Sequence, residues 1–405
     1  MDCLDNYRWR LGNHELVPLV IGGMGVDIST MELALEAARL GGVGHISDAM
    51  ACLVSDRRFG TRYSLGKFKR YRQESDRSRY RFDPGELRDA QLRHVCAAMD
   101  RKVGPGLVFL NVMEKLSMLD ASETLKIRLT AALDGGIDGV TLSAGLHHKS
   151  LKLIEDHPRF REVKLGIIVS SLRALEIFLR AAQRSQRLPD YVVVEGPLAG
   201  GHLGFGEDWA QHRLESIVDE ILAYLREHEL PIAVIPAGGI FTGTDATRFL
   251  QTGAAAVQVA TRFTVTRECG LPAAVKQAYF RASEEEVVVN SASPTGYLMR
   301  MLSTSPCLDS KVEPKCRLHG YMLDRSGDCA YVRAWEATPK GQSVPGKMCL
   351  CHHFSRHQCY TCGHFAYRLK DTSRPDGQGG YRLLSAEHVF LDYQHSREHQ
   401  IRLPP

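Results

Sequence analysis

The chain has 405 residues and a formal net charge of +4, from 51 lysine and arginine residues against 47 aspartate and glutamate residues. This length can hold one barrel-sized domain with an additional region, or two medium-sized domains. The nearly balanced charge disfavours a dedicated nucleic-acid-binding protein, and no apolar run is long enough to span a membrane.

The first ten residues are polar and charged and do not resemble a secretory signal. We therefore expect a cytoplasmic globular protein, and a homo-oligomer is compatible with this composition. The eleven cysteines are unevenly distributed, because seven of them fall between Cys307 and Cys362. In a cytoplasmic chain such a cluster indicates metal ligands or redox chemistry before structural disulfides.

Short apolar segments alternate with amphipathic segments through the first two thirds of the chain. Eight segments have the character of buried strands: residues 16–21, 43–47, 106–113, 139–144, 164–170, 191–195, 232–237 and 256–263. Helices are predicted between them, for instance over residues 30–40 with Ser29 as the N-cap, and over residues 122–133, 171–182, 209–228 and 244–252. Eight repeats of strand and helix predict an α/β fold, the (β/α)8 TIM barrel. The alternative is an open, doubly wound sheet.

We expect the barrel within residues 1–305 and a second region without this rhythm in residues 306–405. Between the second strand and its helix, residues 56–82 form a basic insertion with ten lysine and arginine residues against three acidic ones. Such a segment can contact a phosphate-bearing ligand or an acidic partner protein. A solvated excursion over one face of the barrel is the interpretation we favour.

Glycine and polar residues follow the predicted strands, and in a (β/α)8 barrel the site forms at the C-terminal ends of the strands. Gly238 and Gly239 follow the seventh strand, and Ala260 and Thr261 lie at the end of the eighth. Bare N–H groups at these two positions commonly surround a phosphate in such barrels. Simple tight turns are the alternative interpretation of these glycines.

The loop after the sixth strand delivers one histidine, His202, directly after Gly200 and Gly201. The two glycines remove side-chain bulk, so a flat ligand can lie against the backbone beside an imidazole that titrates near neutrality. The alternative is an ordinary histidine in a turn.

Four segments of the chain, in this order and spacing, resemble the nitronate monooxygenase family, formerly called 2-nitropropane dioxygenases: PLVIGGMGVDIS, VVVEGPLAGGHLG, IPAGGIFTG and GAAAVQVATRFTVTREC. The resemblance covers about residues 15–305, and its most specific part is the Ala-Gly-Gly-His element. Residues 290–296 also resemble the segment that follows the barrel in many members. Ile21 stands where many relatives have glutamine, Ala260 where they have glycine, and residues 188–190 read Leu-Pro-Asp where Gly-Ala-Asp is usual.

Members of this family are FMN-dependent (β/α)8 barrels. The resemblance implies that the FMN phosphate is surrounded by Gly238, Gly239, Gly243, Ala260 and Thr261. It implies that the isoalloxazine and ribityl portions are lined by Gly22, Gly23, Met24 and Asn111. The predicted cofactor site is completed by Ser143, Glu195 and Gly201.

The family's catalytic histidine falls on His202. The resemblance implies that this imidazole removes the α-proton of a neutral nitroalkane or hydrogen-bonds the nitro group of a nitronate. One electron then passes to FMN, and O2 reacts with the resulting radical pair. The expected partners are thus a small-molecule substrate and O2. Ser170, His147 and His148 face the same mouth, and we expect the two histidines to be plain surface residues.

The C-terminal region combines cysteine and histidine at chelating spacing. Cys349 and Cys351 form a CxC pair, and Cys359 and Cys362 form a CxxC pair seven residues further on. Two such pairs can supply the four ligands of a tetrahedral metal site. The mixed cysteine and histidine content favours zinc over an iron–sulfur cluster, with uncoordinated thiols as the remaining alternative.

Two other functions are compatible with these residues. One is an FMN-dependent enoyl reductase of fatty-acid or polyketide synthesis, because those barrels share the flavin site and a similarly placed Gly-Gly-His. The basic insertion could then meet an acidic carrier protein. The other is a catalytically silent flavin barrel whose cysteine-rich region binds metal and mediates assembly.

Overall fold

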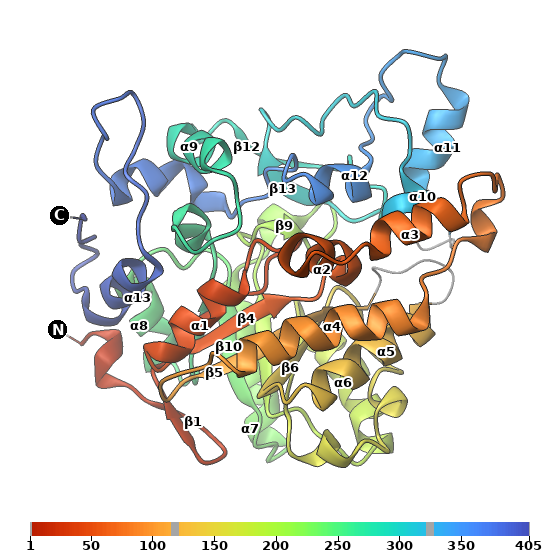
Figure 1. Cartoon of the computed structure of the whole chain (residues 1–405). Coiled ribbons are helices and arrows are strands. Elements are labelled where there is room, and N and C mark those ends of the chain that lie inside the picture. Colours follow the sequence, from red (N-terminus) through yellow and green to blue (C-terminus); the bar gives the residue numbers. More distant parts are fainter. Residues whose placement is uncertain (1, 115–120, 321–327, 405) are drawn as a thin grey trace.

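The computed structural model describes residues 2–114, 121–320 and 328–404. Eight parallel strands close into a barrel in the order β10-β11-β3-β4-β5-β6-β7-β8 (Figure 1). The strands are β3 (Leu19–Ile21), β4 (Val43–Ser47), β5 (Leu107–Met113), β6 (Gly139–Ser143), β7 (Lys164–Val169), β8 (Tyr191–Glu195), β10 (Ala233–Ala237) and β11 (Val257–Val259). The predicted (β/α)8 TIM barrel is confirmed, and the open sheet is excluded.

Helices cover the outside of the barrel between successive strands, except between β6 and β7, where the chain forms two short 3-10 segments, Leu151–Leu153 and Pro158–Arg161. The helices are α1 (Met31–Arg39), α2 (Ala51–Phe59), α3 (Tyr63–Arg70), α4 (Pro84–Met99), α5 (Ala121–Asp134), α6 (Leu172–Arg184), α7 (Leu214–Glu227) and α8 (Gly243–Gln251). The N-cap of α1 is Thr30, which accepts a hydrogen bond from the Leu33 N–H, and not Ser29 as predicted. Ser29 Oγ accepts instead from the Met24 N–H at 2.8 Å, so it holds the loop after β3.

The barrel interior is a packed core below the strand ends. The hairpin β1 (Trp9–Leu11) and β2 (His14–Leu16) closes the bottom, where Trp9 packs edge-on against Tyr191. Inside, His45 donates to the Ile21 carbonyl at 2.8 Å and bonds Thr141 Oγ1, which in turn bonds the Tyr191 hydroxyl. Burial lowers the pKa of His45 to about 4, so this ring stays neutral in the core. These side chains and the hairpin fill this end of the barrel.

The chain after the barrel lies above the strand ends and along one side (Figure 1). It contains α9 (Ala273–Arg281), β12 (Val287–Asn290), β13 (Met299–Leu302), α10 (Cys316–His319), α11 (Ala330–Ala337), α12 (Leu350–Ser355), the 3-10 segment η7 (His364–Thr372) and α13 (Ala386–His395). α13 packs beside α1 and α8, and its Phe390 and Tyr393 share one hydrophobic cluster with Leu19 and Val257 of the barrel. The C-terminal region thus contributes to the core around the barrel.

The basic insertion packs against this C-terminal region through Lys67. Its ammonium group donates to the carbonyl oxygens of Cys316 at 2.9 Å and Arg317 at 3.1 Å. Aromatic rings of Tyr71, Tyr80 and Phe82 lie within 5.9 Å of the same nitrogen. Burial lowers the pKa of Lys67 to about 8. The prediction of a solvated segment is therefore wrong for Lys67, which is buried. Its charge is stabilised there by hydrogen bonds to carbonyl oxygens and by the faces of aromatic rings.

Among the described residues, no helix combines the length and apolar character needed to cross a bilayer.

A buried ion pair joins the segment after β11 to α13. Arg262 Nη1 lies 2.6 Å from Asp392 Oδ2, and both side chains are at most 1% exposed. Removing one partner leaves a buried charge without compensation, so we expect Arg262→Ala to lower the free energy of unfolding by about 3–5 kcal/mol. Chemical denaturation followed by circular dichroism measures this change.

The matched control for that variant is Lys315→Ala, which breaks the exposed pair with Glu313. Exposed pairs contribute little, so this variant should unfold close to the wild-type midpoint. Equal midpoints for the two variants would show that α13 is not fixed to the barrel by Arg262.

Candidate functional site

His202 lies on β9 (Gly201–His202), a short strand that pairs with β13 and not with the barrel. Its Nε2 bonds Ser293 Oγ at 2.7 Å, and Ser293 is fully buried. Ser293 Oγ also bonds Thr295 Oγ1 at 2.8 Å, which fixes the hydroxyl from a second side. Burial lowers the pKa of His202 to about 4, because the charged ring is poorly solvated there. His202 is therefore a neutral imidazole with a fixed orientation at pH 7.

The loop before His202 is held by a buried arginine. Arg300 on β13 donates from Nη1 to the carbonyl oxygens of Pro197 and Ala199, both at 2.6 Å. The guanidinium also lies 4.8 Å from the centre of the Trp209 ring. Gly200 is required in this loop, because a Cβ there would come within 2.5 Å of the Cys362 backbone. These contacts fix the path of the chain into His202.

The glycines after β3 run between two amide side chains. A Cβ at Gly22 would meet the Gln258 side chain at 3.2 Å, and a Cβ at Gly23 would overlap the Asn111 side chain. Asn111 Oδ1 and Gln258 Oε1 are both buried, with no hydrogen-bond partner among the residues that the structure describes. Buried polar atoms are normally paired, so two orphaned acceptors at one end of a barrel indicate a ligand with N–H donors.

Two further predicted residues end the strands β8 and β6, which are separated by β7 in the barrel. Glu195 ends β8, and burial raises the pKa of its carboxyl to about 7. Ser143 ends β6, is buried, and donates to the Val112 carbonyl at 3.3 Å. His147, expected at the surface, is instead fully buried and bonds the Ser143 carbonyl and Ser150 Oγ, whereas His148 is exposed as predicted. The buried ring serves as a support under the loop after β6.

The glycines predicted to surround a phosphate lie against the loop that leads to His202. Gly238 has φ +93°, and a Cβ there would lie 2.9 Å from the Ala199 nitrogen. Thr261, after β11, faces Gly363 of the C-terminal region so closely that a Cβ on Gly363 would overlap its hydroxyl. The next N–H, from His364, donates to the Leu198 carbonyl at 3.0 Å. Residues 198–199, 238–239, 261 and 363 thus converge.

Gly243 and the remaining predicted cofactor residues are placed as follows. Gly243 begins α8 and is buried against α13, where a Cβ would overlap the Tyr393 carbonyl. The structure therefore shows Gly243 in contact with α13. Met24 is half-buried after β3, Ala260 directly follows β11, and Gly201 has the positive φ of +74° that its turn requires.

The four cysteines predicted to bind a metal do not form one site. Cys307 Sγ donates to Cys359 Sγ at 3.6 Å, and the Cys362 backbone packs under Gly200. Cys349, Cys351 and Cys359 belong to a different hydrophobic cluster from Cys362. Across the described residues, no group of three or more histidine, cysteine, aspartate or glutamate side chains is placed to hold a metal ion. The predicted zinc or iron–sulfur site at Cys349, Cys351, Cys359 and Cys362 is therefore not supported.

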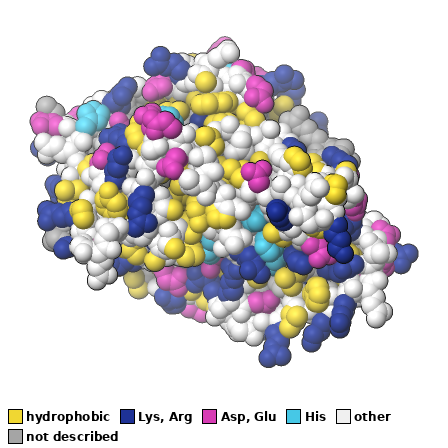
Figure 2. Space-filling model, turned by 90° about the horizontal axis from the view of Figure 1, so that it is seen from above, with side chains coloured by type: hydrophobic (Ala, Val, Ile, Leu, Met, Phe, Trp, Pro, Cys, Tyr) yellow, Lys and Arg dark blue, Asp and Glu magenta, His cyan; other side chains and the backbone are white. Residues whose placement is uncertain are grey.

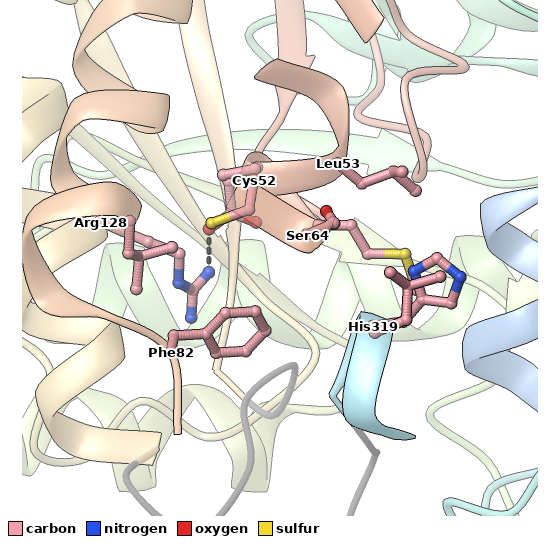
Figure 3. A pocket seen from close by; sticks show the side chains of 11 residues that line it. Cys52, Leu53, Ser64, Phe82, Arg128 and His319 are labelled. Atoms are coloured by element: carbon pink, nitrogen blue, oxygen red, sulfur yellow. Dashed lines mark hydrogen bonds and ion pairs between the residues drawn. The ribbon is translucent and has the colours of Figure 1, made fainter. Parts of the chain in front are cut away.

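A small cavity of about 30 Å³ lies between α2, the insertion and α10. Arg128 and Phe82 lie on one side of it and His319 on the other (Figure 3). Arg128 forms a buried ion pair with Asp48 at its wall. About one water molecule fills such a volume. The cavity contains none of the predicted site residues, although Met50, one of its lining residues, also packs in the hydrophobic cluster of Phe354.

Sequence reasoning missed three residues of the site. Gln258 lay within a predicted strand but carried no signal beyond its polarity. Ser293 lies in residues 290–296, which resemble the corresponding segment of other family members. The resemblance indicated the segment but not the contact of Ser293 with His202. Arg300 carried no signal, because its partners Pro197 and Ala199 lie about a hundred residues earlier in the chain.

Comparison with known proteins gives the family. The family model described as nitronate monooxygenase matches residues 112–316, half of the chain. A probable nitronate monooxygenase of Staphylococcus saprophyticus is 25% identical over 183 residues, which are 45% of this chain and 48% of that protein. The protein named (3aS,4S,5R,7aS)-5-hydroxy-7a-methyl-1-oxo-octahydro-1H-indene-4-carboxyl-CoA dehydrogenase, from Mycobacterium tuberculosis, is 33% identical over 132 residues, 33% of this chain and 34% of that protein. The chain thus matches about half or less of the length of these relatives.

Solved structures match over nearly the whole chain and share its fold. FabK from Thermotoga maritima has a TM-score of 0.55 and 19% identity, over 96% of this chain and 93% of that one. A nitroalkane oxidase from Streptomyces ansochromogenes has a TM-score of 0.54 and 17% identity, over 93% and 94%. With the family model matching from β5 to α10, the chain belongs to the nitronate monooxygenase family.

Proposed function

We propose that this protein is an FMN-dependent oxidoreductase that oxidises a nitronate, the anion of a nitroalkane, with O2. The observation that carries the proposal is a half-buried His202 with a lowered pKa, fixed by Ser293 at the end of the barrel where Asn111 and Gln258 present unpaired acceptors. Membership of the nitronate monooxygenase family and the matching Staphylococcus protein support it.

The residues present fit a flavin. The pyrimidine edge of a flavin carries an N–H donor between two carbonyl acceptors. The amides of Asn111 and Gln258 can accept a hydrogen bond from such an N–H through their oxygens and donate to such carbonyls through their NH2 groups. The backbone at Gly238, Gly239, Ala260 and Thr261 offers N–H groups for the phosphate of FMN. The chemistry that FMN supplies when bound is electron transfer between the substrate and O2.

The low pKa of His202 favours one of the two roles that the family resemblance leaves open. A general base works best when its pKa lies near the working pH, and a pKa of about 4 is too low for efficient removal of a carbon-bound proton at pH 7. A neutral imidazole can instead donate a hydrogen bond to the oxygens of a substrate that is already anionic. Nε2 is engaged by Ser293, so we assign Nδ1 to the substrate. We therefore propose the nitronate, and not the neutral nitroalkane, as the substrate form.

The cytoplasmic location stays a prediction. The carrier-protein partner belongs to the enoyl reductase alternative. Anaerobic addition of NADPH tests that alternative. An enoyl reductase would show bleaching of the bound flavin with NADPH alone, in the absence of a nitronate.

We expect His202 to titrate near pH 4 in the folded protein, because burial disfavours its charged form. NMR of histidine-labelled protein, assigned with His202→Gln, measures this pKa. The unfolded chain binds the proton with an ordinary pKa of 6.5, so neutral His202 contributes stability that is complete above pH 6.5 and is lost as the pH falls towards 4. A midpoint near 6.5 in the folded protein would contradict the assignment.

Removal of either amide should weaken flavin binding. We expect Asn111→Ala and Gln258→Ala each to raise the FMN dissociation constant about tenfold, since an unpaired buried polar group costs on the order of 1–3 kcal/mol. Quenching of FMN fluorescence on titration with the apoprotein measures the constant. Gln251→Ala, at an exposed position at the end of α8, is the control and should bind FMN normally. Unchanged binding in both site variants would place the flavin elsewhere.

Removal of the imidazole should abolish most turnover and leave the cofactor bound. We expect His202→Ala to lower kcat/KM for ethylnitronate about a hundredfold, as loss of a single preorganised donor does in other enzymes. Oxygen consumption measures the rate, and the visible spectrum measures bound FMN. The exposed His148→Ala is the control. A His202→Ala protein with bound FMN and wild-type turnover would refute the role of His202.

A further inference from the structure

The helix α12 of the C-terminal region brings an aromatic side chain to His202. The ring centres of Phe354 and His202 are 6.5 Å apart, and the ring planes meet at 84°. Figure 1 shows α12 above the strand ends, near β9 and β13. Seen from this side, the molecule presents hydrophobic side chains between lysine, arginine and histidine side chains (Figure 2). Phe354 itself is half-buried, so part of its side chain packs against the protein and part is accessible to solvent.

Phe354 completes an apolar wall that the barrel itself provides. Its hydrophobic neighbours are Val26 after β3, Ala49 and Met50 after β4, and Met113 at the end of β5. Three successive strand ends therefore contribute uncharged side chains at the mouth, and Phe354 joins this wall to the imidazole of His202. An apolar wall beside a hydrogen-bonding group suits a ligand with a polar head and an alkyl chain.

The position of Phe354 is fixed from both sides of the helix. Arg57 of α2 donates to the carbonyl of Ser355, the residue that follows Phe354. His357 donates to the Val26 carbonyl at 2.9 Å, and Ser355 Oγ bonds His319 of α10 at 3.3 Å. On the other side, His353 Nε2 bonds Ser310 Oγ at 2.8 Å. Because the helix that carries Phe354 is anchored in this way, the backbone cannot move aside cheaply, and the ring can limit the size of a ligand at this position.

We propose that Phe354 is a specificity-determining residue, which with Met50 and Met113 forms the alkyl-binding wall of the substrate pocket and restricts turnover to short alkyl nitronates. The inference rests on the proposed function for the substrate class. According to this inference, the C-terminal region contributes a side chain to the substrate pocket, whereas its cysteine spacing had indicated only a metal site. The polar head of the substrate lies at His202, and the alkyl chain ends against Phe354.

The test compares Phe354→Ala and Phe354→Leu with the wild type on ethylnitronate and hexylnitronate. Removal of the ring opens space for the longer chain, so we expect the ratio of kcat/KM for hexylnitronate to that for ethylnitronate to rise about tenfold in Phe354→Ala. The change should lie mainly in KM, with Phe354→Leu between the two proteins. Phe365→Ala is the matched control, because that ring contacts Phe241 and belongs to the same C-terminal region.

A second measurement needs no turnover. Diethyl pyrocarbonate modifies accessible imidazoles, and peptide mass spectrometry gives the rate at His202. If Phe354 covers the ring, this rate rises severalfold in Phe354→Ala and stays at the wild-type value in Phe365→Ala. Should Phe354→Ala fail to fold, Phe354→Leu decides both measurements.

The outcomes separate the two proposals. A wild-type protein that binds flavin but oxidises no nitronate refutes the proposed function, and the modification rate alone then decides whether Phe354 covers His202. An unchanged rate of modification with an unchanged substrate ratio overturns the inference. A faster modification with an unchanged ratio also overturns it, because Phe354 would then cover the imidazole without selecting the substrate.

Discussion

The position of His202 depends on a strand pair that is not part of the barrel. His202 pairs with Met299 and Gly201 with Arg300, and β9 is only two residues long. So short a strand cannot fix a side chain by its own hydrogen bonds, and its direction is set by what lies on either side. Arg300 provides that restraint, because its backbone pairs with Gly201 while its guanidinium binds the carbonyls of Pro197 and Ala199. One residue after the barrel thus orients the loop that carries His202.

The same arrangement explains why the C-terminal region is integral to the fold. Arg262 after β11 and Asp392 of α13 are both buried and form an ion pair between the barrel and this region. Phe390 packs closely on the turn before β4, because a Cβ at Gly42 would lie 2.6 Å from its ring. A separate appendage would leave these groups exposed or unpaired. Because Gly363 and Phe354 also reach the barrel mouth, changes in residues 306–405 are expected to alter the site as well as stability.

The barrel could be predicted from the sequence because buried parallel strands are continuous apolar runs. β4 and β8 agree with the predicted bounds, and the other strands differ at their ends. The eighth strand is the exception, since residues 256–263 form only Val257–Val259 before Ala260 leaves the extended conformation at ψ −47°. The segment that follows contains Arg262, whose buried side chain pairs with the distant Asp392, a contact that the local sequence pattern does not show. Cysteine spacing failed for the same reason, because the partner of Cys359 is Cys307 and not the neighbouring Cys362.

The charged groups near the mouth bear on the proposed anionic substrate. Burial moves the titratable groups towards their neutral forms, since it lowers the pKa of His202 to about 4 and raises that of Glu195 to about 7. Arg300 keeps its positive charge behind the loop, because its pKa stays at about 10 although burial lowers it, and its Nη2 has no hydrogen-bond partner among the described residues. A buried cation whose field is not cancelled stabilises an anion nearby, and the carbonyls of Pro197 and Ala199 that it binds lie on the path to His202. A nitronate seated at His202, as proposed, would raise the pKa of the imidazole above its value in the empty site, because a nearby negative charge favours the protonated ring.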